Sequence, residues 1–179
     1  MRTFDSGAVR DSNTGKGRCD LLPLDVVCDV VNDNVLSQIH KFKEDGDYNH
    51  LIELLKNEIK DNTYDDLLGI SDRFEMGAVK YGDENWKKGI PASVYVDSGI
   101  RHYLKYKRGD EDEPHRIAYM WNMLCCIWTC KHNTDMNVYL NGTVAWDISG
   151  NRDSRDCIDI IDIDPLAIFE SPMVDDPLK

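Results

Sequence analysis

The chain has 179 residues, of which 41% are hydrophobic, which is enough for one domain with a buried core. Its 33 acidic residues outnumber its 21 basic ones, so the net charge is −12. Such a surface repels phosphates, which disfavours a binder of nucleic-acid polymers or of anionic membranes. The longest nearly apolar run, residues 117–130, is shorter than the roughly 20 residues of a membrane span.

Six cysteines are present, and three of them share one apolar run: Cys125, Cys126 and Cys130. They form no CxxC pair and have no histidines nearby at zinc-ligand spacing. Reduced, buried thiols are therefore expected. Together with the lack of a signal peptide in residues 1–10, they predict a cytoplasmic location.

Apolar periodicity predicts a helical body that follows a loop at residues 1–22. Pro23 suits the first turn of a helix, Ser93 can cap another, and Pro114 suits the start of the last. Residues 61–66 are predicted to be a break, and Leu104 to lie on a buried stripe. The predicted helices are 23–31, 34–44, 50–60, 70–81, 93–108 and 115–131.

Past Lys131 the pattern becomes β-prone. Residues 136–148 form two short runs around Asn141-Gly142, a strong hairpin signal, and 157–164 are rich in isoleucine. We therefore predict a mainly α fold, with a helical domain at 1–131 and a β-hairpin appendage with a tail at 132–179.

The stretch "KYGDENWKKGIP", residues 80–91, concentrates side chains that suit a nucleotide. Trp86 and Tyr81 offer flat faces for a base, Asn85 offers an amide for its edge, and Lys80 offers a cation for phosphate. The alternative is a helix end followed by a turn that a buried tryptophan pins.

The next predicted helix places polar side chains opposite its apolar stripe. At 100° per residue, Ser98, Arg101, His102 and Lys105 share one face, and Asp97 has the i,i+4 spacing of an ion pair with Arg101. This face is either an ordinary solvated surface or a ridge that contacts phosphate.

The most apolar helix carries His115 and Asn122 on one face. The Asn122 amide needs hydrogen bonds if it is buried, so it braces the packing or belongs to a site. The acidic residues 110–113 before this helix, Glu113 among them, and Glu75 on an earlier helix are solvated acids or ligands of a hard divalent ion.

Taken in order, "GKGRCDLLP", "GAVKYGDENWKKGIP", "DSGIRHYLKY" and "HRIAYMWNMLCCI" resemble the MazG-like dATP/dGTP diphosphohydrolases of phages and bacteria. The resemblance covers about residues 15–30 and 70–130. It rests on Gly15, Lys16, Arg18, Asp20, Leu21, Pro23, Gly77, Ala78, Lys80, Tyr81, Gly82, Asn85, Trp86, Gly89, Ser98, Arg101, His102, His115, Trp121 and Asn122.

The resemblance implies an all-α enzyme that uses Mg²⁺, or Mn²⁺ in its place, to split a purine deoxynucleoside triphosphate into monophosphate and pyrophosphate. It implies catalytic roles for Arg101, His102 and His115. The implied substrate-binding residues are Lys16, Arg18, Asp20, Lys80, Tyr81, Asn85, Trp86, Ser98 and Asn122. The metal ligands are expected among Glu75, Asp97 and Glu113, with His115 and Asn122 as further candidates.

MazG-type enzymes also carry EExxE and ExxD carboxylate pairs and complete their sites by oligomerising. This chain has neither pair in the matching helices. A dimer or tetramer in phage nucleotide metabolism is expected. The alternatives are a non-catalytic protein that binds nucleotide on the same scaffold, and an assembly protein whose residues 132–179 make contacts.

Overall fold

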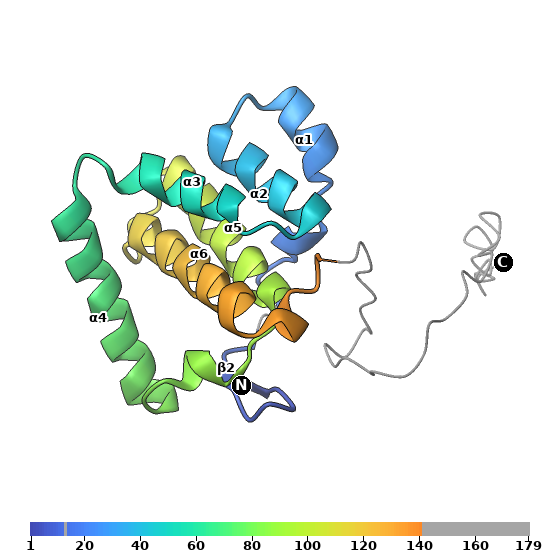
Figure 1. Cartoon of the computed structure of the whole chain (residues 1–179). Helices are drawn as coiled ribbons and strands as arrows, with labels where there is room; N and C mark the ends of the chain where they lie inside the picture. The colour runs from blue at the N-terminus through green and yellow to red at the C-terminus, as the bar shows by residue number, and fades with distance from the viewer. Residues whose placement is uncertain (13, 141–179) are drawn as a thin grey trace, which may run out of the picture. The chain divides into compact units, whose positions relative to one another are not determined.

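The computed structural model describes residues 1–12 and 14–140, which belong to one structural unit and are mainly helical (Figure 1). The prediction of a mainly α fold is confirmed for these residues, and its likeness to a MazG-type bundle stays a prediction. The elements are β1 Arg2–Thr3, β2 Val9–Arg10, η1 Cys19–Leu21, α1 Leu24–Val30, α2 Asn34–Asp45, α3 Asn49–Ile59, α4 Thr63–Tyr81, η2 Asn85–Lys88, α5 Ala92–Arg108, α6 His115–His132 and η3 Thr134–Met136.

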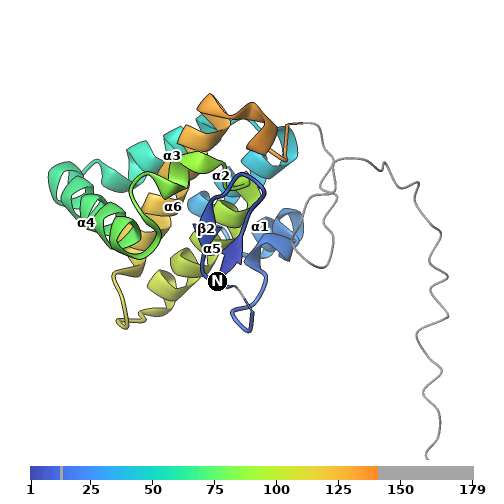
Figure 2. The same ribbon diagram turned by 90° about the horizontal axis from the view of Figure 1, so that it is seen from below.

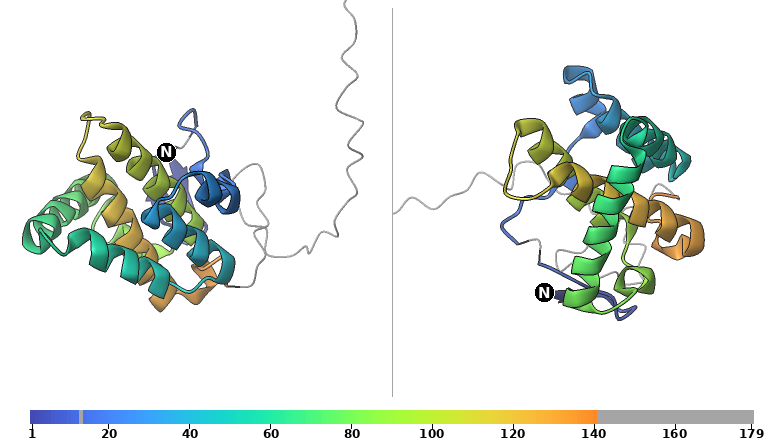
Figure 3. Two further views of the ribbon diagram at one scale, coloured as in Figure 1. Left: turned by 90° about the horizontal axis from the view of Figure 1, so that it is seen from above. Right: turned by 90° about the vertical axis from the view of Figure 1, so that its left-hand side faces the viewer.

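The core is built on an antiparallel pair of helices, α5 and α6, which a short loop joins (Figure 3). Gly99 lets them approach closely, because a Cβ there would lie 2.2 Å from the Met123 Cε atom. The core includes the fully buried Ile39, Phe42, Leu51, Leu54, Tyr95, Val96, Ile100, Tyr119, Met120 and Met123. Burial of this apolar surface holds the pair together.

The helices α1 to α3 and the helix α4 flank this pair on different sides (Figures 1 and 3). Asp33 caps α2 by accepting from the Leu36 N–H at 3.0 Å, and it also accepts from the Tyr103 hydroxyl of α5 at 2.5 Å. Gly46 ends α2 in the left-handed region, with φ +71°. One aspartate thus fixes both the start of α2 and its position on the core.

Helix α4 begins at Thr63, so the predicted break at 61–66 was wrong beyond Asn62. Asp65 and Asp66 lie in the first turn, where the helix dipole favours negative charge. Asp66 also accepts from Arg116 of α6 at 2.5 Å. These aspartates belong to a helix start that a distant arginine stabilises.

The N-terminal segment was predicted to be a loop, and this was wrong in two places. Residues 2–3 and 9–10 pair as a short antiparallel hairpin, β1–β2, in which Arg2 stands opposite Arg10. Figure 2 shows this hairpin beside α5, and residues 19–21 add the 3₁₀ turn η1. Strands of two residues carry too little periodicity to be predicted from sequence.

The first arm of the predicted C-terminal hairpin, residues 136–140, is not a strand. Met136 ends η3, and the turn that follows buries Tyr139 edge-to-face on Phe42, with ring centroids 5.1 Å apart. Asn137 donates to the Gly46 carbonyl at 2.8 Å. The second arm and the predicted strand at 157–164 lie outside the described residues, and the boundary after residue 131 stays a prediction.

Two local predictions on α5 were wrong. The helix is preceded by Pro91, and Ser93 lies inside it with a buried hydroxyl that has no hydrogen-bond partner. Leu104 is exposed, although Val96 and Tyr103 of the same stripe are buried. The burial of Cys125, Cys126 and Cys130 as free thiols is confirmed.

Within the described residues, no helix is both long enough and apolar enough to cross a bilayer.

Gly46→Ala is expected to destabilise the protein by about 1–3 kcal/mol more than Gly109→Ala. Both glycines end a helix at positive φ, but only at Gly46 would a Cβ meet backbone, at 2.6 Å from the Leu140 nitrogen. Urea unfolding of the two variants measures the difference. Equal losses would show that residues 137–140 do not pack against the end of α2.

Candidate functional site

A cavity of about 1290 Å³ lies between the last three turns of α4, the β1–β2 hairpin, η2 and the faces of α5 and α6. Cations outnumber carboxylates on its wall, although acids dominate the whole chain. The cationic residues are Arg2, Arg10, Lys16, Arg73, Lys80, Arg101 and Lys105. The cavity is therefore a basic pocket in an acidic protein, which suits an anionic ligand.

Arg2 and Arg10 stand directly opposite each other in the hairpin, and both line the cavity. Neither forms an ion pair with any carboxylate of residues 1–12 and 14–140. Each also has a buried nitrogen without a hydrogen-bond partner, Nε of Arg2 and Nη1 of Arg10. Like charges opposite each other destabilise a ladder, so this pair suits an anion that binds between the two.

Arg10 is held in place by the helices behind it. Its guanidinium lies over Tyr95 and Trp121, 4.9 Å and 5.7 Å from the ring centroids, and Nη2 donates to the Asn122 Oδ1 atom at 2.5 Å. Asn122 in turn donates to the Ala118 carbonyl at 2.8 Å. Asn122 thus braces the packing and also belongs to the cavity wall, and these are the two roles that its sequence position allowed.

Aromatic side chains form another part of the cavity wall. Trp86 is half-buried and packs against Phe74 and Trp128, with ring centroids 5.1 Å and 4.9 Å apart, and Tyr81 lies nearby on the rim. Trp86 therefore both supports the turn and lines the cavity. The wall offers apolar ring faces close to cationic side chains.

The structure gives Asn85 a role different from base reading. Its Oδ1 accepts from the Val9 N–H at 2.8 Å, and its Nδ2 donates to the Val9 carbonyl at 2.7 Å. The Asn85 amide thus forms with Val9 the pair of hydrogen bonds that a neighbouring strand would form. It fastens the hairpin, and with it Arg10, to the cavity wall.

Asp97 also organises backbone. Its carboxylate accepts from the Cys19 and Asp20 N–H groups at 2.8 and 3.4 Å and forms the predicted ion pair with Arg101. Arg101 donates in addition to the Lys16 and Gly17 carbonyls. Asp97 and Arg101 therefore shape the loop that brings Lys16 to the cavity.

Two predicted substrate-binding residues do not reach the cavity. Arg18 and Asp20 hydrogen-bond each other at 2.7 and 2.6 Å, and the Asp20 carbonyl accepts from Lys43 at 2.7 Å. Of the others, Ser98 and Lys80 line it, and Lys80 pairs with Asp11 at 2.6 Å.

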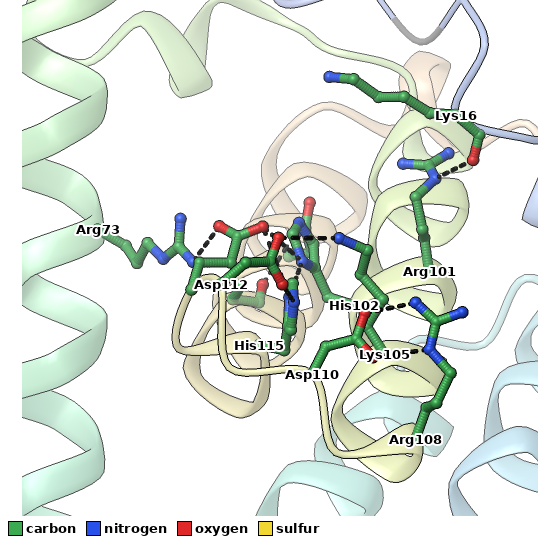
Figure 4. A network of polar contacts seen from close by, with 12 residues as sticks. Lys16, Arg73, Arg101, His102, Lys105, Arg108, Asp110, Asp112 and His115 are labelled. Carbon is green, nitrogen blue, oxygen red and sulfur yellow. Dashed lines mark hydrogen bonds and ion pairs between the residues drawn. The ribbon is translucent and has the colours of Figure 1, made fainter.

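His102 and His115 form a histidine pair beside the cavity (Figure 4). The Nδ1 atoms of His102 and His115 are 3.0 Å apart, and the Glu113 Oε1 atom lies 3.4 and 3.5 Å from them. Arg73 reaches across from α4 and donates to the other Glu113 oxygen at 2.7 Å. His115 is buried behind the wall, whereas His102 and Glu113 line the cavity.

The three carboxylates predicted as metal ligands do not meet. Asp97 is occupied by Arg101 and two backbone N–H groups, and Glu75 is an exposed residue of α4. Among the described residues, Glu113 shares a possible metal cluster with His102 and His115. Of the expected ligands, Glu113 and His115 are therefore brought together, and the Mg²⁺ site itself stays a prediction.

The sequence of the chain shows which family it belongs to. Residues 43–138 match the sequence model of the family described as dATP/dGTP diphosphohydrolase, N-terminal. The match spans more than half of the 179 residues. The chain belongs to the dATP/dGTP diphosphohydrolase family. No curated protein and no solved structure matches it.

The family match covers only part of the cavity wall. The walls from α4, η2, α5 and α6 lie inside residues 43–138. The hairpin with Arg2 and Arg10 lies before them. The sequence interpretation missed these arginines and Arg73, because none belongs to a motif. Arg2 and Arg10 lie in a segment without apolar periodicity, and Arg73 is one charged residue within the predicted helix 70–81.

His102 is expected to stay neutral between pH 5 and 8, because burial, which outweighs the opposing effect of the Glu113 carboxylate, lowers its pKa to about 4. Burial disfavours the charged ring, so protonation needs a lower pH than in a free peptide. NMR titration of the metal-free protein measures this, with the His102 signal assigned by its loss in His102→Asn. A midpoint near the usual value of about 6.5 would contradict it.

Proposed function

We propose that this protein hydrolyses purine deoxynucleoside triphosphates to monophosphate and pyrophosphate, in phage nucleotide metabolism. The observation that carries the proposal is the pair Arg2 and Arg10, which line a basic cavity without carboxylate partners among the described residues. Membership of the diphosphohydrolase family supports the substrate class.

The triphosphate would bind to the cationic wall. Arg10 offers an unpaired Nη1 in a guanidinium that two rings hold flat, and Arg2 and Lys16 add charge beside it. Burial lowers the pKa of both guanidinium groups, and the neighbouring charge of Arg10 lowers that of Arg2 further. A bound anion would restore a favourable environment for both charges. This explains how a protein of charge −12 can hold a polyanion.

The base would lie against the aromatic wall. Trp86, Tyr81 and Phe74 present ring faces that stack on any base, which gives affinity with little choice among bases. The Asn85 amide was predicted to read the base edge, but its oxygen and its nitrogen already form hydrogen bonds with Val9. Base reading by Asn85 therefore stays a prediction.

In the reaction, a water oxygen forms a bond to the α-phosphorus, and the bond from that phosphorus to the α–β bridging oxygen breaks. The electron pair leaves with pyrophosphate, and the proton that the water loses passes to solvent. His102, neutral on the cavity wall, is placed to orient the water, with His115 behind it. Arg101 acts indirectly, through the loop that carries Lys16.

The Mg²⁺ requirement, or its replacement by Mn²⁺, stays a prediction. The predicted ligands Glu75, Asp97 and Glu113 do not converge, so no step above is assigned to Mg²⁺. Their separation favours a second candidate, a protein that binds nucleotide without hydrolysing it.

Arg10→Met is expected to lower kcat/KM for dATP or dGTP by about 10- to 100-fold, because it removes a charge-assisted contact of about 1.5–3 kcal/mol. Pyrophosphate release measures turnover, and Arg108→Met is the matched control, since Arg108 is exposed and pairs with Asp110 away from the cavity.

Equal activity of Arg10→Met and Arg108→Met would remove the phosphate role of Arg10. If no dNTP yields pyrophosphate but dNTPs raise the Tm, the second candidate function is correct. If dNTPs neither react nor bind, both candidates fail.

We also propose that the protein is a homo-oligomer, dimer or tetramer, that pairs through α4. Tyr64, Leu68, Met76 and Val79 lie on one side of this helix and are 62–85% exposed. Apolar stripes of this kind mark contacts between proteins. Met76 of this stripe also lines the cavity, so a second copy would lie beside the cavity wall.

Leu68→Glu is expected to convert the oligomer to monomer, because it buries a charge in the interface. Light scattering after size-exclusion chromatography measures the mass, with Val30→Glu on α1, also exposed, as the control. A monomeric parent protein, or an unchanged mass in Leu68→Glu, would contradict the proposal.

A further inference from the structure

We propose that His102, His115 and Glu113 bind a divalent transition ion of the Zn²⁺ class, with an open coordination position that faces the cavity. Three ligand atoms converge there: Nδ1 of His102, Nδ1 of His115 and Oε1 of Glu113. A role of this ion in hydrolysis rests on the proposed function. Metal binding itself is measured without nucleotide, so the metal site and the proposed function can be refuted separately.

The distances suit a metal better than a hydrogen-bond network. The three atoms are 3.0, 3.4 and 3.5 Å apart. Ligands at bond lengths of about 2.05 Å around a tetrahedral Zn²⁺ are separated by about 3.3 Å. The two separations to Glu113 are longer than good hydrogen bonds, so its carboxylate oxygen is placed as a third ligand beside the two rings.

A second carboxylate orients His115. Its Nε2 lies 2.7 Å from Asp112 Oδ1, and because a carboxylate only accepts, the proton of the neutral ring is on Nε2. The Nδ1 lone pair therefore points toward His102 and Glu113. Metal-binding histidines usually donate their other nitrogen to a carboxylate in this way. Lys105 holds the other Asp112 oxygen at 3.2 Å.

Arg73 orients Glu113 in the same manner. It binds Oε2 at 2.7 Å and leaves Oε1 directed at the two rings. In the metal-free protein, His102 Nδ1–H donates to the His115 lone pair. Binding of an ion requires only that this proton move to Nε2 of His102, so the ring stays neutral.

The ligand types decide the class of ion. Imidazole nitrogen suits Zn²⁺ and its neighbours, whereas Mg²⁺ prefers oxygen ligands and octahedral geometry. Two histidines and one glutamate with an open fourth position form the ligand set of catalytic zinc hydrolases. His102 and Glu113 line the cavity, so the open position faces the space proposed for the triphosphate.

The test uses the full chain, made metal-free with a chelator and titrated with Co²⁺ while visible absorption is recorded. We expect one Co²⁺ per chain with the intense absorption of four-coordinate cobalt. One equivalent of Zn²⁺ should abolish this signal, and millimolar Mg²⁺ should leave it unchanged.

The variants His102→Ala and Glu113→Gln should weaken Co²⁺ binding at least tenfold, and His50→Ala, a surface histidine paired with Asp45, should not. Circular dichroism checks that each variant is folded. His102 is chosen because its side chain is 21% exposed, so its removal disturbs the core less than removal of the buried His115.

Equal Co²⁺ affinity of His102→Ala and the parent protein would overturn the site. Displacement of Co²⁺ by millimolar Mg²⁺ would overturn the assigned class of ion. Metal binding as expected in a protein that binds no dNTP would leave the site intact and refute the proposed function.

Discussion

The candidate site depends on the pairing between the Asn85 side chain and the Val9 backbone. These two hydrogen bonds, at 2.8 and 2.7 Å, connect residues 76 positions apart and fasten a two-strand hairpin onto a helical body. They help to hold Arg10 over the rings of Tyr95 and Trp121. A short hairpin is unstable alone, so the helices must supply its order.

Asp97 holds the loop before η1 in place in a similar way. A buried carboxylate is costly unless it is paired, and here two backbone N–H groups and Arg101 satisfy it. The same contacts set the path of Lys16 into the cavity. Buried polar residues therefore position the cations, while the apolar pair α5 and α6 supplies the rigid support.

The sequence allowed α2, α3, α5 and α6 to be predicted because each buries an apolar stripe, and α2, α3 and α6 begin and end within a residue of expectation. The start of α4 and the hairpin were missed, since both depend on partners far along the chain: Arg116 for Asp66, and Asn85 for Val9. The face that Ser98, Arg101, His102 and Lys105 share does line the cavity. Residue spacing could not show that the Asp97 and Asn85 side chains hydrogen-bond to backbone groups, because those groups lie 76 or more residues away in the sequence.

The central claim is that Arg10, whose Nη1 has no hydrogen-bond partner among the described residues, binds a phosphate of the substrate. A crystal structure with a deoxynucleoside triphosphate whose α–β bridging oxygen is replaced by NH tests it most directly. We predict a phosphate oxygen within hydrogen-bond distance of Arg10 Nη1, with the base against Trp86. A nucleotide bound elsewhere, with Arg10 still stacked on Tyr95 and Nη1 unpaired, would contradict the account.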